Sequence, residues 1–182
     1  MGVKIINMLF NEIHYRTEKD KINLQNGKEI LRLAVRAVVF DGSKLLMAHL
    51  EKTNEYKFPG GGRKENETAE EALKREVLEE VGYKVIKIKE KIGVITEYDT
   101  ATEGEGYYFK MISEYYAADV ENFQFEQNLE PDEEELLFKP CWVDIKKAYK
   151  KNIDSIKENP DKTPGINRET IALEKIIEGM GC

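Results

Sequence analysis

The sequence contains little cysteine, no long apolar run and no excess of positive charge. Its two cysteines, Cys141 and Cys182, lie far apart, which argues against a disulfide framework and for reduced thiols in a cytoplasm. No stretch approaches the roughly 20 apolar residues that a membrane-spanning helix needs. The apolar run within residues 1–10 is also too short for the core of a signal peptide. We therefore expect a cytoplasmic protein.

The shortage of positive charge limits the classes of partner. A net charge of −7 argues against a general nucleic-acid binder or a membrane-surface binder, because both need a basic surface. The two histidines, His14 and His49, are too isolated to indicate a zinc site. With 41% apolar and 35% charged residues, the chain of 182 residues suits one globular domain with a heavily charged surface.

The most informative array combines a glycine-rich loop, residues 59–62, with a charged segment that follows it. Five residues separate Gly61 from Glu67, and seven separate Glu67 from Arg75. Arg75 opens the sequence Arg-Glu-Val-Leu-Glu-Glu-Val-Gly over residues 75–82. One arginine and three carboxylates thus lie directly behind a loop whose glycines let backbone approach a ligand closely.

Glu76, Glu79 and Glu80 share one face of a helix because they stand at i, i+3 and i+4. Like charges so placed repel each other by a few tenths of a kcal/mol per pair. A hard divalent cation such as Mg²⁺ or Mn²⁺ would remove that penalty. The alternative is a solvated, glutamate-rich surface helix. An isolated ion pair such as Arg75 with Glu79 is ordinary on such a helix, but the full array is not.

The helix that carries these carboxylates has clear start and stop signals. Thr68 with Glu71 forms a capping box, Asn66 and Thr68 are both candidate N-caps, and Gly82 is suited to end the helix. An apolar stripe that would hold the helix on a sheet consists of Ala69, Ala72, Leu73 and Val77.

The rest of the chain alternates between strand and helix patterns, which predicts an α/β layered domain. The acidic segment 121–135 is predicted to be a loop. Strands are predicted over 31–40, 44–50, 86–98, 107–120 and 141–144, and helices over 145–159 and 167–178.

The array resembles the signature of the Nudix (MutT-like) hydrolases: Gly, five residues, Glu, seven residues, Arg-Glu-aliphatic-any-Glu-Glu-any-Gly-aliphatic. Every fixed position is matched from Gly61 to Gly82. The last position departs from it, since Tyr83 replaces an aliphatic residue whose role is packing. The resemblance implies a Nudix fold, a mixed β-sheet sandwiched between α-helices. It further implies a single domain over 1–182, with an N-terminal β extension (1–31), a Nudix core (32–145) and C-terminal helices (146–182).

The resemblance also implies a distinct role for each residue of the site. Glu76, Glu79 and Glu80 would bind the metal, with one of them a candidate general base, and the Gly60 carbonyl is a further candidate ligand. Arg75 would orient Glu67 or Glu79 through charge-assisted hydrogen bonds. Glu67 would support the ligands from outside, and Gly61 would meet a conformational requirement. A further carboxylate ligand is expected from Glu134 or Glu135, with Glu103 and Glu105 as competitors.

The implied activity is Mg²⁺- or Mn²⁺-dependent cleavage of a nucleoside diphosphate linked to another moiety. The substrate could be a nucleoside triphosphate, a nucleotide sugar or a dinucleoside polyphosphate. Tyr98 and Tyr56 are weak candidates for contacts with it, because tyrosines in strands are commonly structural. The alternative is a non-catalytic nucleotide-binding or regulatory module on the same fold. Isoprenoid diphosphate isomerisation is poorly supported, because no cysteine precedes the helix. The expected partner is a small nucleotide, with no nucleic acid or membrane, and a homodimer is one candidate assembly.

Overall fold

The computed structural model describes residues 10–15, 27–99, 106–158 and 165–180 of the chain. None of the helices in these ranges is long and apolar enough to cross a membrane. The strands are β1 (Phe10–Tyr15), β2 (Lys28–Val38), β3 (Phe40–Asp41), β4 (Lys44–Leu50), β5 (Glu55–Lys57), β6 (Tyr83–Asp99), β7 (Tyr107–Gln124) and β8 (Phe138–Asp144). The helices are α2 (Ala69–Val81), α3 (Pro131–Glu135), α4 (Ile145–Glu158) and α5 (Ile166–Gly179).

The predicted elements are present to within a few residues, but the predicted loop over 121–135 is wrong. Strand β7 continues to Gln124, and α3 begins at Pro131. Proline suits the first turn of a helix, where its missing N–H costs nothing, and Glu130 and Glu133 cap each other reciprocally. Much of the predicted N-terminal extension, residues 1–9 and 16–26, lies outside the described residues.

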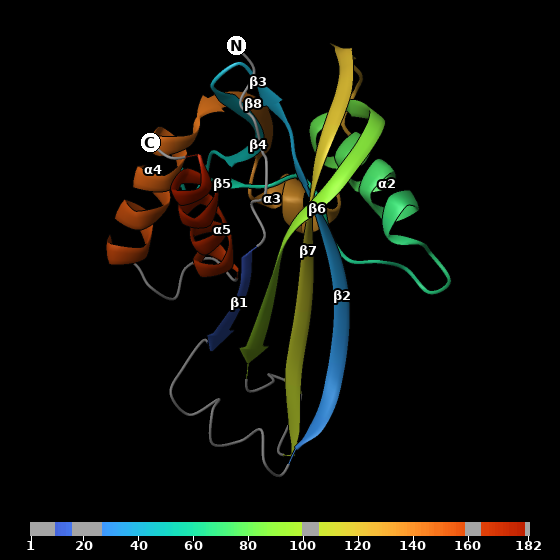
Figure 1. The fold of residues 1–182 in the computed structure, drawn as a ribbon, viewed down its shortest axis with the longest axis vertical. Helices are drawn as coiled ribbons and strands as arrows, with labels where there is room; N and C mark the ends of the chain where they lie inside the picture. Colours follow the sequence, from blue (N-terminus) through green and yellow to red (C-terminus); the bar gives the residue numbers. More distant parts are fainter. Residues whose placement is uncertain (1–9, 16–26, 100–105, 159–164, 181–182) are drawn as a thin grey trace.

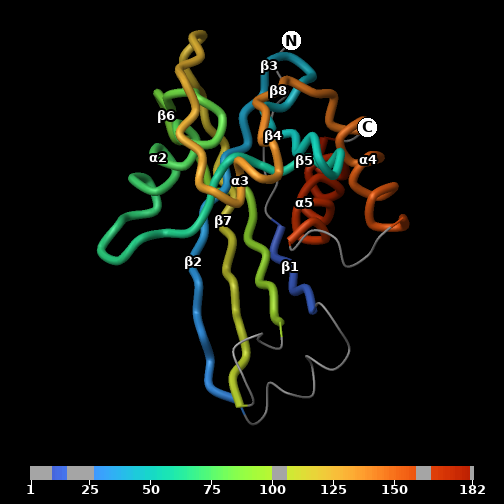
Figure 2. Tube along the Cα trace, turned by 180° about the vertical axis from the view of Figure 1, so that it is seen from behind, coloured from blue at the N-terminus to red at the C-terminus, as the bar shows by residue number. Residues whose placement is uncertain are grey.

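Two sheets form the framework. The first has the strand order β1-β6-β7-β2; β6 and β7 are antiparallel, while β1 and β2 run parallel to their neighbours. The second, antiparallel sheet has the order β3-β4-β5, with β8 paired to the other side of β4. Figure 1 shows α2 on one side of these strands and α4 with α5 on the other, and Figure 2 shows the same arrangement from behind.

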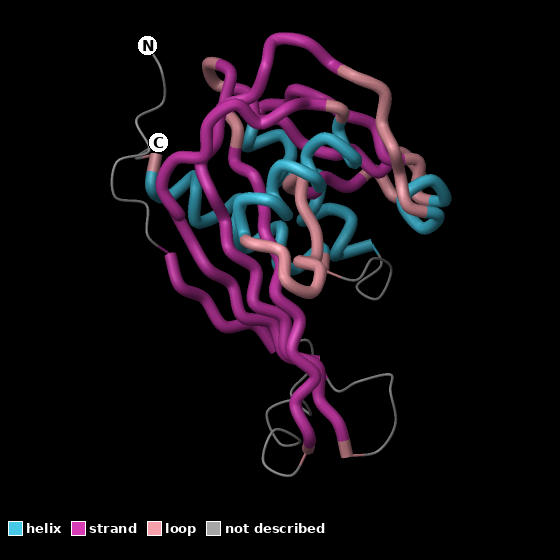
Figure 3. The backbone as a smooth tube through the Cα atoms, turned by 90° about the vertical axis from the view of Figure 1, so that its right-hand side faces the viewer, coloured by secondary structure: helices cyan, strands magenta, loops and turns pink. Residues whose placement is uncertain are grey.

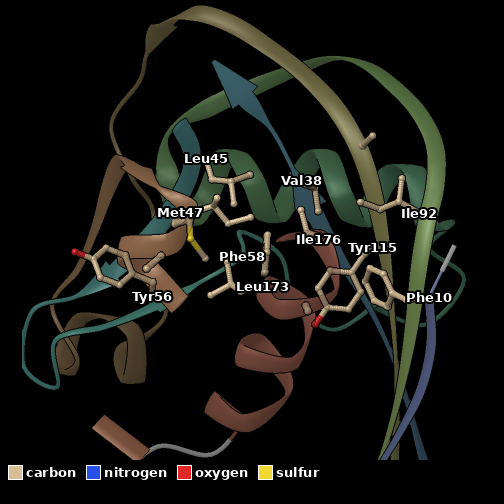
Figure 4. Packing of buried hydrophobic residues seen from close by; sticks show 14 of the residues in the cluster. Phe10, Val38, Leu45, Met47, Tyr56, Phe58, Ile92, Tyr115, Leu173 and Ile176 are labelled. Carbon is tan, nitrogen blue, oxygen red and sulfur yellow. The ribbon is translucent and has the colours of Figure 1, made fainter. Parts of the chain in front are cut away.

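Strand β2 contributes side chains to both hydrophobic cores, because successive side chains of a strand point to opposite faces of the sheet. Val35 and Ala37 pack in the cluster that contains Leu73 and Val77 of α2. Val38 packs in the other cluster, with Leu173 and Ile176 of α5 (Figure 4). Helices therefore cover both faces of the strands, and the chain has the predicted mixed α/β fold.

The strands of the first sheet reach beyond the layer of helices, and β2 and β7 extend farthest past α2 and α5 in Figure 1. Figure 3 shows strands extending below the helices from another side. The register of β2 and β7 is parallel and unbroken, from Lys28 beside Tyr107 to Val38 beside Ala117. Strands β2 and β7 thus stay paired without interruption from the buried core to the site described below.

Candidate functional site

Helix α2 begins and ends at the predicted residues. The Glu71 N–H donates to Thr68 Oγ1 at 3.2 Å, and the Thr68 N–H donates to Glu71 Oε2 at 2.9 Å, which completes the capping box. Gly82 ends the helix in the left-handed region, at φ 71°. A Cβ there would stand 2.3 Å from the Phe125 carbonyl oxygen, so only glycine fits. The helix between these two ends includes Glu76, Glu79 and Glu80, whose spacing places them on one face.

Residues 59–62 run against the edge of β2, and the glycines there have no free space for a Cβ. The Val35 N–H donates to the Gly61 carbonyl at 3.0 Å. Gly60 has φ 137°, and a Cβ on it would stand 2.1 Å from the Val35 carbonyl oxygen. A Cβ on Gly61 would stand 2.6 Å from Oε2 of Glu76. The glycines therefore let the loop contact both the sheet and the carboxylate face of α2.

The Gly60 peptide is held from both sides. Its N–H donates to Glu80 Oε2 at 2.7 Å, and its carbonyl accepts a hydrogen bond from Arg36 Nη1. Glu80 is 5% exposed, and burial raises its pKa well above the usual 4.5 even though the Arg36 cation acts in the opposite direction. Gly60 is thus hydrogen-bonded to both Glu80 and Arg36, which line the site with it.

Arg75 lies at the centre of a network of acidic partners. Its Nε and Nη2 donate to Glu67 at 2.7 and 2.8 Å, and its Nη1 donates to Glu76 at 2.7 Å and to Glu79 at 3.1 Å. Nη2 also donates to the Gly62 carbonyl at 3.1 Å. These bonds lower the pKa of Glu67 to about 2. Arg75 therefore contacts both of the glutamates that it was expected to orient.

A third acidic side chain, from α3, approaches Glu76 and Glu80. Burial raises the pKa of Glu133, and the nearby negative charges of Glu130 and Glu76 raise it further. The charge of Glu133 in turn raises the pKa of Glu80, after the larger effect of burial. A hydrogen bond with the Glu80 side chain acts in the opposite direction and lowers the pKa of Glu133. Glu76, Glu80 and Glu133 therefore lie close enough to influence one another's charge.

The structure does not bring the predicted Glu134 and Glu135 to this group. Both are exposed, and Glu135 pairs with Lys52 on the surface at 3.0 Å. Their neighbour Glu133 points inward instead, because α3 is a helix and turns adjacent residues to different sides. The competing candidates Glu103 and Glu105 lie outside the described residues.

The donor set fits a hard divalent cation. Glu76, Glu80 and Glu133 offer only oxygen ligands, and each has a pKa raised by burial and by like charge, a penalty that a cation would remove. Among the described residues, no three acidic, histidine or cysteine side chains are arranged so that they could hold a metal ion as they stand. Arg75 holds Glu76 and Glu79 instead, so a cation would compete with Arg75 for these carboxylates.

Glu76, Glu80 and Glu133 line a pocket of about 580 Å³ that contains both negative and positive side chains. The acids come from α2, α3 and the end of β6, whereas the bases come from β2, β5, the two residues after the glycine loop, and α5. The acidic lining residues are Glu76, Glu80, Asp99, Glu130, Asp132 and Glu133, and the basic ones are Arg32, Arg36, Lys57, Arg63, Lys64 and Arg168. The pocket thus combines carboxylates that suit a metal with cations that suit phosphate oxygens.

Beneath the pocket, α5 contributes a buried ionic network. Glu169 accepts from the Phe58 N–H at 3.1 Å and pairs with Arg36 at 3.7 Å and Arg168 at 3.1 Å. Arg168 also pairs with Glu97 of β6 at 3.4 Å. Burial alone would raise the pKa of Glu169, but the surrounding cations hold it below its usual value. The network ties α5 to the glycine loop through Phe58 and Arg36.

Sequence reasoning missed this network, although a signal was present. Glu169 lies on the same helical stripe as Ile166, Leu173 and Ile176, all of them buried, so an inward-facing charge could have been recognised. Arg36 similarly interrupts the buried run of β2. Neither residue shows its partner in the sequence, because Arg36 and Glu169 stand 133 positions apart.

Neither tyrosine that was considered for substrate contacts is among the residues lining the pocket. Tyr56 is 6% exposed in the hydrophobic core and stacks on His49, with ring centroids 4.6 Å apart. Tyr98 stacks on Tyr15 at 5.3 Å. Its side chain points away from the pocket, because its neighbour Asp99 lines the pocket and side chains alternate along a strand.

Known proteins give a consistent comparison. The family described as NUDIX domain matches residues 30–163. A NUDIX hydrolase from Nitrosomonas europaea has a similar structure, with a TM-score of 0.53 and 18% identity, over 83% of this chain and 91% of that one. A MutT NUDIX hydrolase from Burkholderia pseudomallei has a TM-score of 0.54 and 19% identity, over 81% and 98%. At this identity the likeness shows the fold alone. No curated protein matches the chain in sequence.

Proposed function

The chain belongs to the NUDIX family, and from that membership we propose that it is a pyrophosphohydrolase dependent on Mg²⁺ or Mn²⁺. Members of the family typically act on nucleotide-type substrates with divalent metals. The proposed substrate is a nucleoside diphosphate linked to another moiety. The products would be a nucleoside monophosphate and either a phosphorylated moiety or pyrophosphate.

One observation carries the proposal: three carboxylates with raised pKa values line the same pocket as six basic side chains. Glu76, Glu79 and Glu80, with the Gly60 carbonyl, would hold the metal, and the structure adds Glu133 as a further candidate ligand. A bound divalent cation would polarise phosphoryl oxygens and lower the pKa of its water.

The chain's own residues then have distinct tasks. Arg75 holds Glu76 and Glu79 in place through its bonds of 2.7 and 3.1 Å until a cation takes over these carboxylates. Arg36 of β2, and Arg63 and Lys64 directly after the glycine loop, bind and orient the phosphate chain, which supplies much of the catalysis in phosphoryl transfer. A carboxylate of the acidic group accepts the proton of the attacking water.

The test is hydrolysis of a nucleotide panel by the whole chain. The panel contains nucleoside triphosphates, nucleotide sugars, ADP-ribose and dinucleoside polyphosphates, each with Mg²⁺, with Mn²⁺ and with excess chelator. We expect turnover of at least one substrate that the chelator abolishes. Folded protein that binds a nucleotide but cleaves none would overturn the proposal in favour of a non-catalytic module on this fold. Turnover that resists the chelator would reject the metal dependence.

A further inference from the structure

The lining of the pocket includes an apolar platform on β7. Phe109 and Met111 both line the pocket, and they point to the same side of the strand because they are two residues apart. Met111 is 8% exposed, beneath Arg168 of α5, while Phe109 is half-buried. A flat aromatic surface open to a pocket is suited to stacking against a planar ring.

Two groups of opposite hydrogen-bonding character flank the platform. Asp99 of β6 stands directly opposite Phe109 in the antiparallel register, and Arg32 of β2 stands beside Met111 in the parallel register. Both flanking residues also line the pocket. A carboxylate only accepts hydrogen bonds and a guanidinium only donates them. The platform therefore has an acceptor on one side and a donor on the other.

Arg32 is available to a ligand. Its guanidinium lies over Gly62, where a Cβ would stand 2.8 Å from Nε. Within the described part of the chain, no hydrogen bond or ion pair involves the Arg32 side chain. The absence of a side chain at Gly62 thus leaves space for this cation beside the glycine loop.

The platform lies at a suitable distance from the catalytic groups. Gly62 pairs with Ala34, and Ala34 stands beside Ser113 of β7. Met111 and Phe109 lie two and four residues before Ser113, or about 7 and 13 Å along an extended strand. A nucleotide whose phosphates lie at the glycine loop can therefore extend along the strand and place its base on Phe109.

We propose that this platform is a nucleobase subsite that selects guanine. Guanine carries adjacent N–H donors on its Watson–Crick edge, for Asp99, and the acceptors O6 and N7 on the other edge, for Arg32. Adenine and cytosine offer the carboxylate one amino donor beside a ring acceptor that repels it, and uracil offers one imino donor between two carbonyls. The substrate of the proposed hydrolase would then be a guanosine or deoxyguanosine diphosphate derivative. This identification of the substrate rests on the proposed function, whereas the base preference does not.

The test measures binding of GMP, AMP, CMP and UMP by calorimetry with Mg²⁺ present. Monophosphates contain no anhydride bond, so binding is read without turnover. We expect the natural chain to bind GMP at least about tenfold more tightly than the other three. Asp99→Asn should weaken GMP about tenfold to a hundredfold and change the others little. Arg32→Gln should also weaken GMP selectively, and Phe109→Ala should weaken all four alike.

Asp119→Asn is the matched control, because Asp119 is also on the β6–β7 pair but bonds to Lys89 away from the pocket. It should bind all four nucleotides as the natural chain does. Equal affinities for the four bases, or an Asp99→Asn effect common to all of them, would overturn the guanine subsite. A guanine preference without hydrolysis of any nucleotide would support the subsite and defeat the hydrolase. Efficient hydrolysis of adenine or pyrimidine nucleotides, together with unchanged binding in Asp99→Asn, would support the hydrolase and defeat the guanine subsite.

Discussion

Helices α2 and α5 both bring charged side chains to the same pocket, but they hold them differently. Arg75 of α2 bonds to Glu76 and Glu79, its neighbours along the helix, and it is 19% exposed. Arg168 of α5 is 4% exposed and pairs with Glu97, which comes from another element of the fold. The ion-pair network around Arg75 is partly open to a ligand, whereas the network around Arg168 is enclosed.

The difference indicates different roles for the two helices. A partly exposed network can release carboxylates to an incoming cation, because solvent screens the charges while the ion pairs separate. A buried ion pair cannot be opened without leaving a charge unpaired in a low dielectric, which costs several kcal/mol. We therefore assign chemistry to α2 and positioning of the glycine loop to α5. The predictions below test this division, from the largest expected effect to the smallest.

The largest effect is expected at the acidic face of α2. Glu80→Gln keeps the volume of the side chain and removes the charge that we propose binds the metal. Activity should fall about a thousandfold, or about 4 kcal/mol in transition-state free energy, because the neutralisation of phosphate charge is lost. Without metal, the thermal midpoint should stay unchanged or rise, because a buried charge is removed. Steady-state rates and melting curves with and without Mg²⁺ measure both.

The matched control is Glu70→Gln, on the same helix but exposed and paired only with Lys74. It should keep the full rate, since a surface pair of this kind contributes little. If Glu80→Gln were as active as this control, the α2 carboxylates would be an ordinary charged surface.

On α5, Glu169→Gln should act on stability more than on chemistry. The substitution leaves Arg36, Arg168 and Lys57 without their shared buried anion. We expect the free energy of unfolding to fall by about 3 kcal/mol, measured by urea denaturation. Glu174→Gln, at a residue that bonds to Tyr149 on the exposed side of α5, is the control and should change it by less than about 0.5 kcal/mol. A comparably small loss at Glu169 would remove the distinction between the helices.

The network of α2 should respond to pH in a defined window. The pKa of Glu67 is lowered from 4.5 to about 2 by Arg75, so its contribution to stability is complete above pH 4.5 and is lost as the pH falls through 2. Glu67→Gln should therefore cost about 2 kcal/mol at pH 7, and the cost should shrink below pH 4.5. Denaturation of both proteins between pH 7 and pH 2 measures this difference. A cost that did not vary with pH would mean that the ion pair with Arg75 is not its source.

The same comparison explains what could be predicted from the sequence. Helix α2 was predictable because its determinants are local: the Thr68 and Glu71 cap, the Gly82 stop, and carboxylates whose spacing places them on one face. The strands of the fold followed from apolar runs broken by turns such as Asp41-Gly42.

The remainder depends on tertiary contacts that no local pattern contains. The pairing of Arg36 with Glu169 arises only when β2 and α5 pack together. Helix α3 was hidden because its acidic residues are typical of a solvated loop. The Pro131 start and the cap between Glu130 and Glu133 were nevertheless present in the sequence. Which acid of α3 points inward was decided by the docking of that helix.

The smallest effect is expected at α3, where it tests that docking. Glu133→Gln should lower activity about tenfold, or about 1.4 kcal/mol, because Glu133 would be one ligand among several. Glu135→Gln is the matched control: it removes the same charge from the same short helix, but at an exposed residue that pairs with Lys52. It should leave the rate unchanged, and Glu134→Gln should do the same. The rate of each variant is measured at increasing Mg²⁺ concentration. A variant that has lost a metal ligand needs more Mg²⁺ to reach its half-maximal rate, whereas a variant at a surface residue does not. A larger loss at Glu134 or Glu135 than at Glu133 would show that α3 presents a different face to the pocket when substrate is bound.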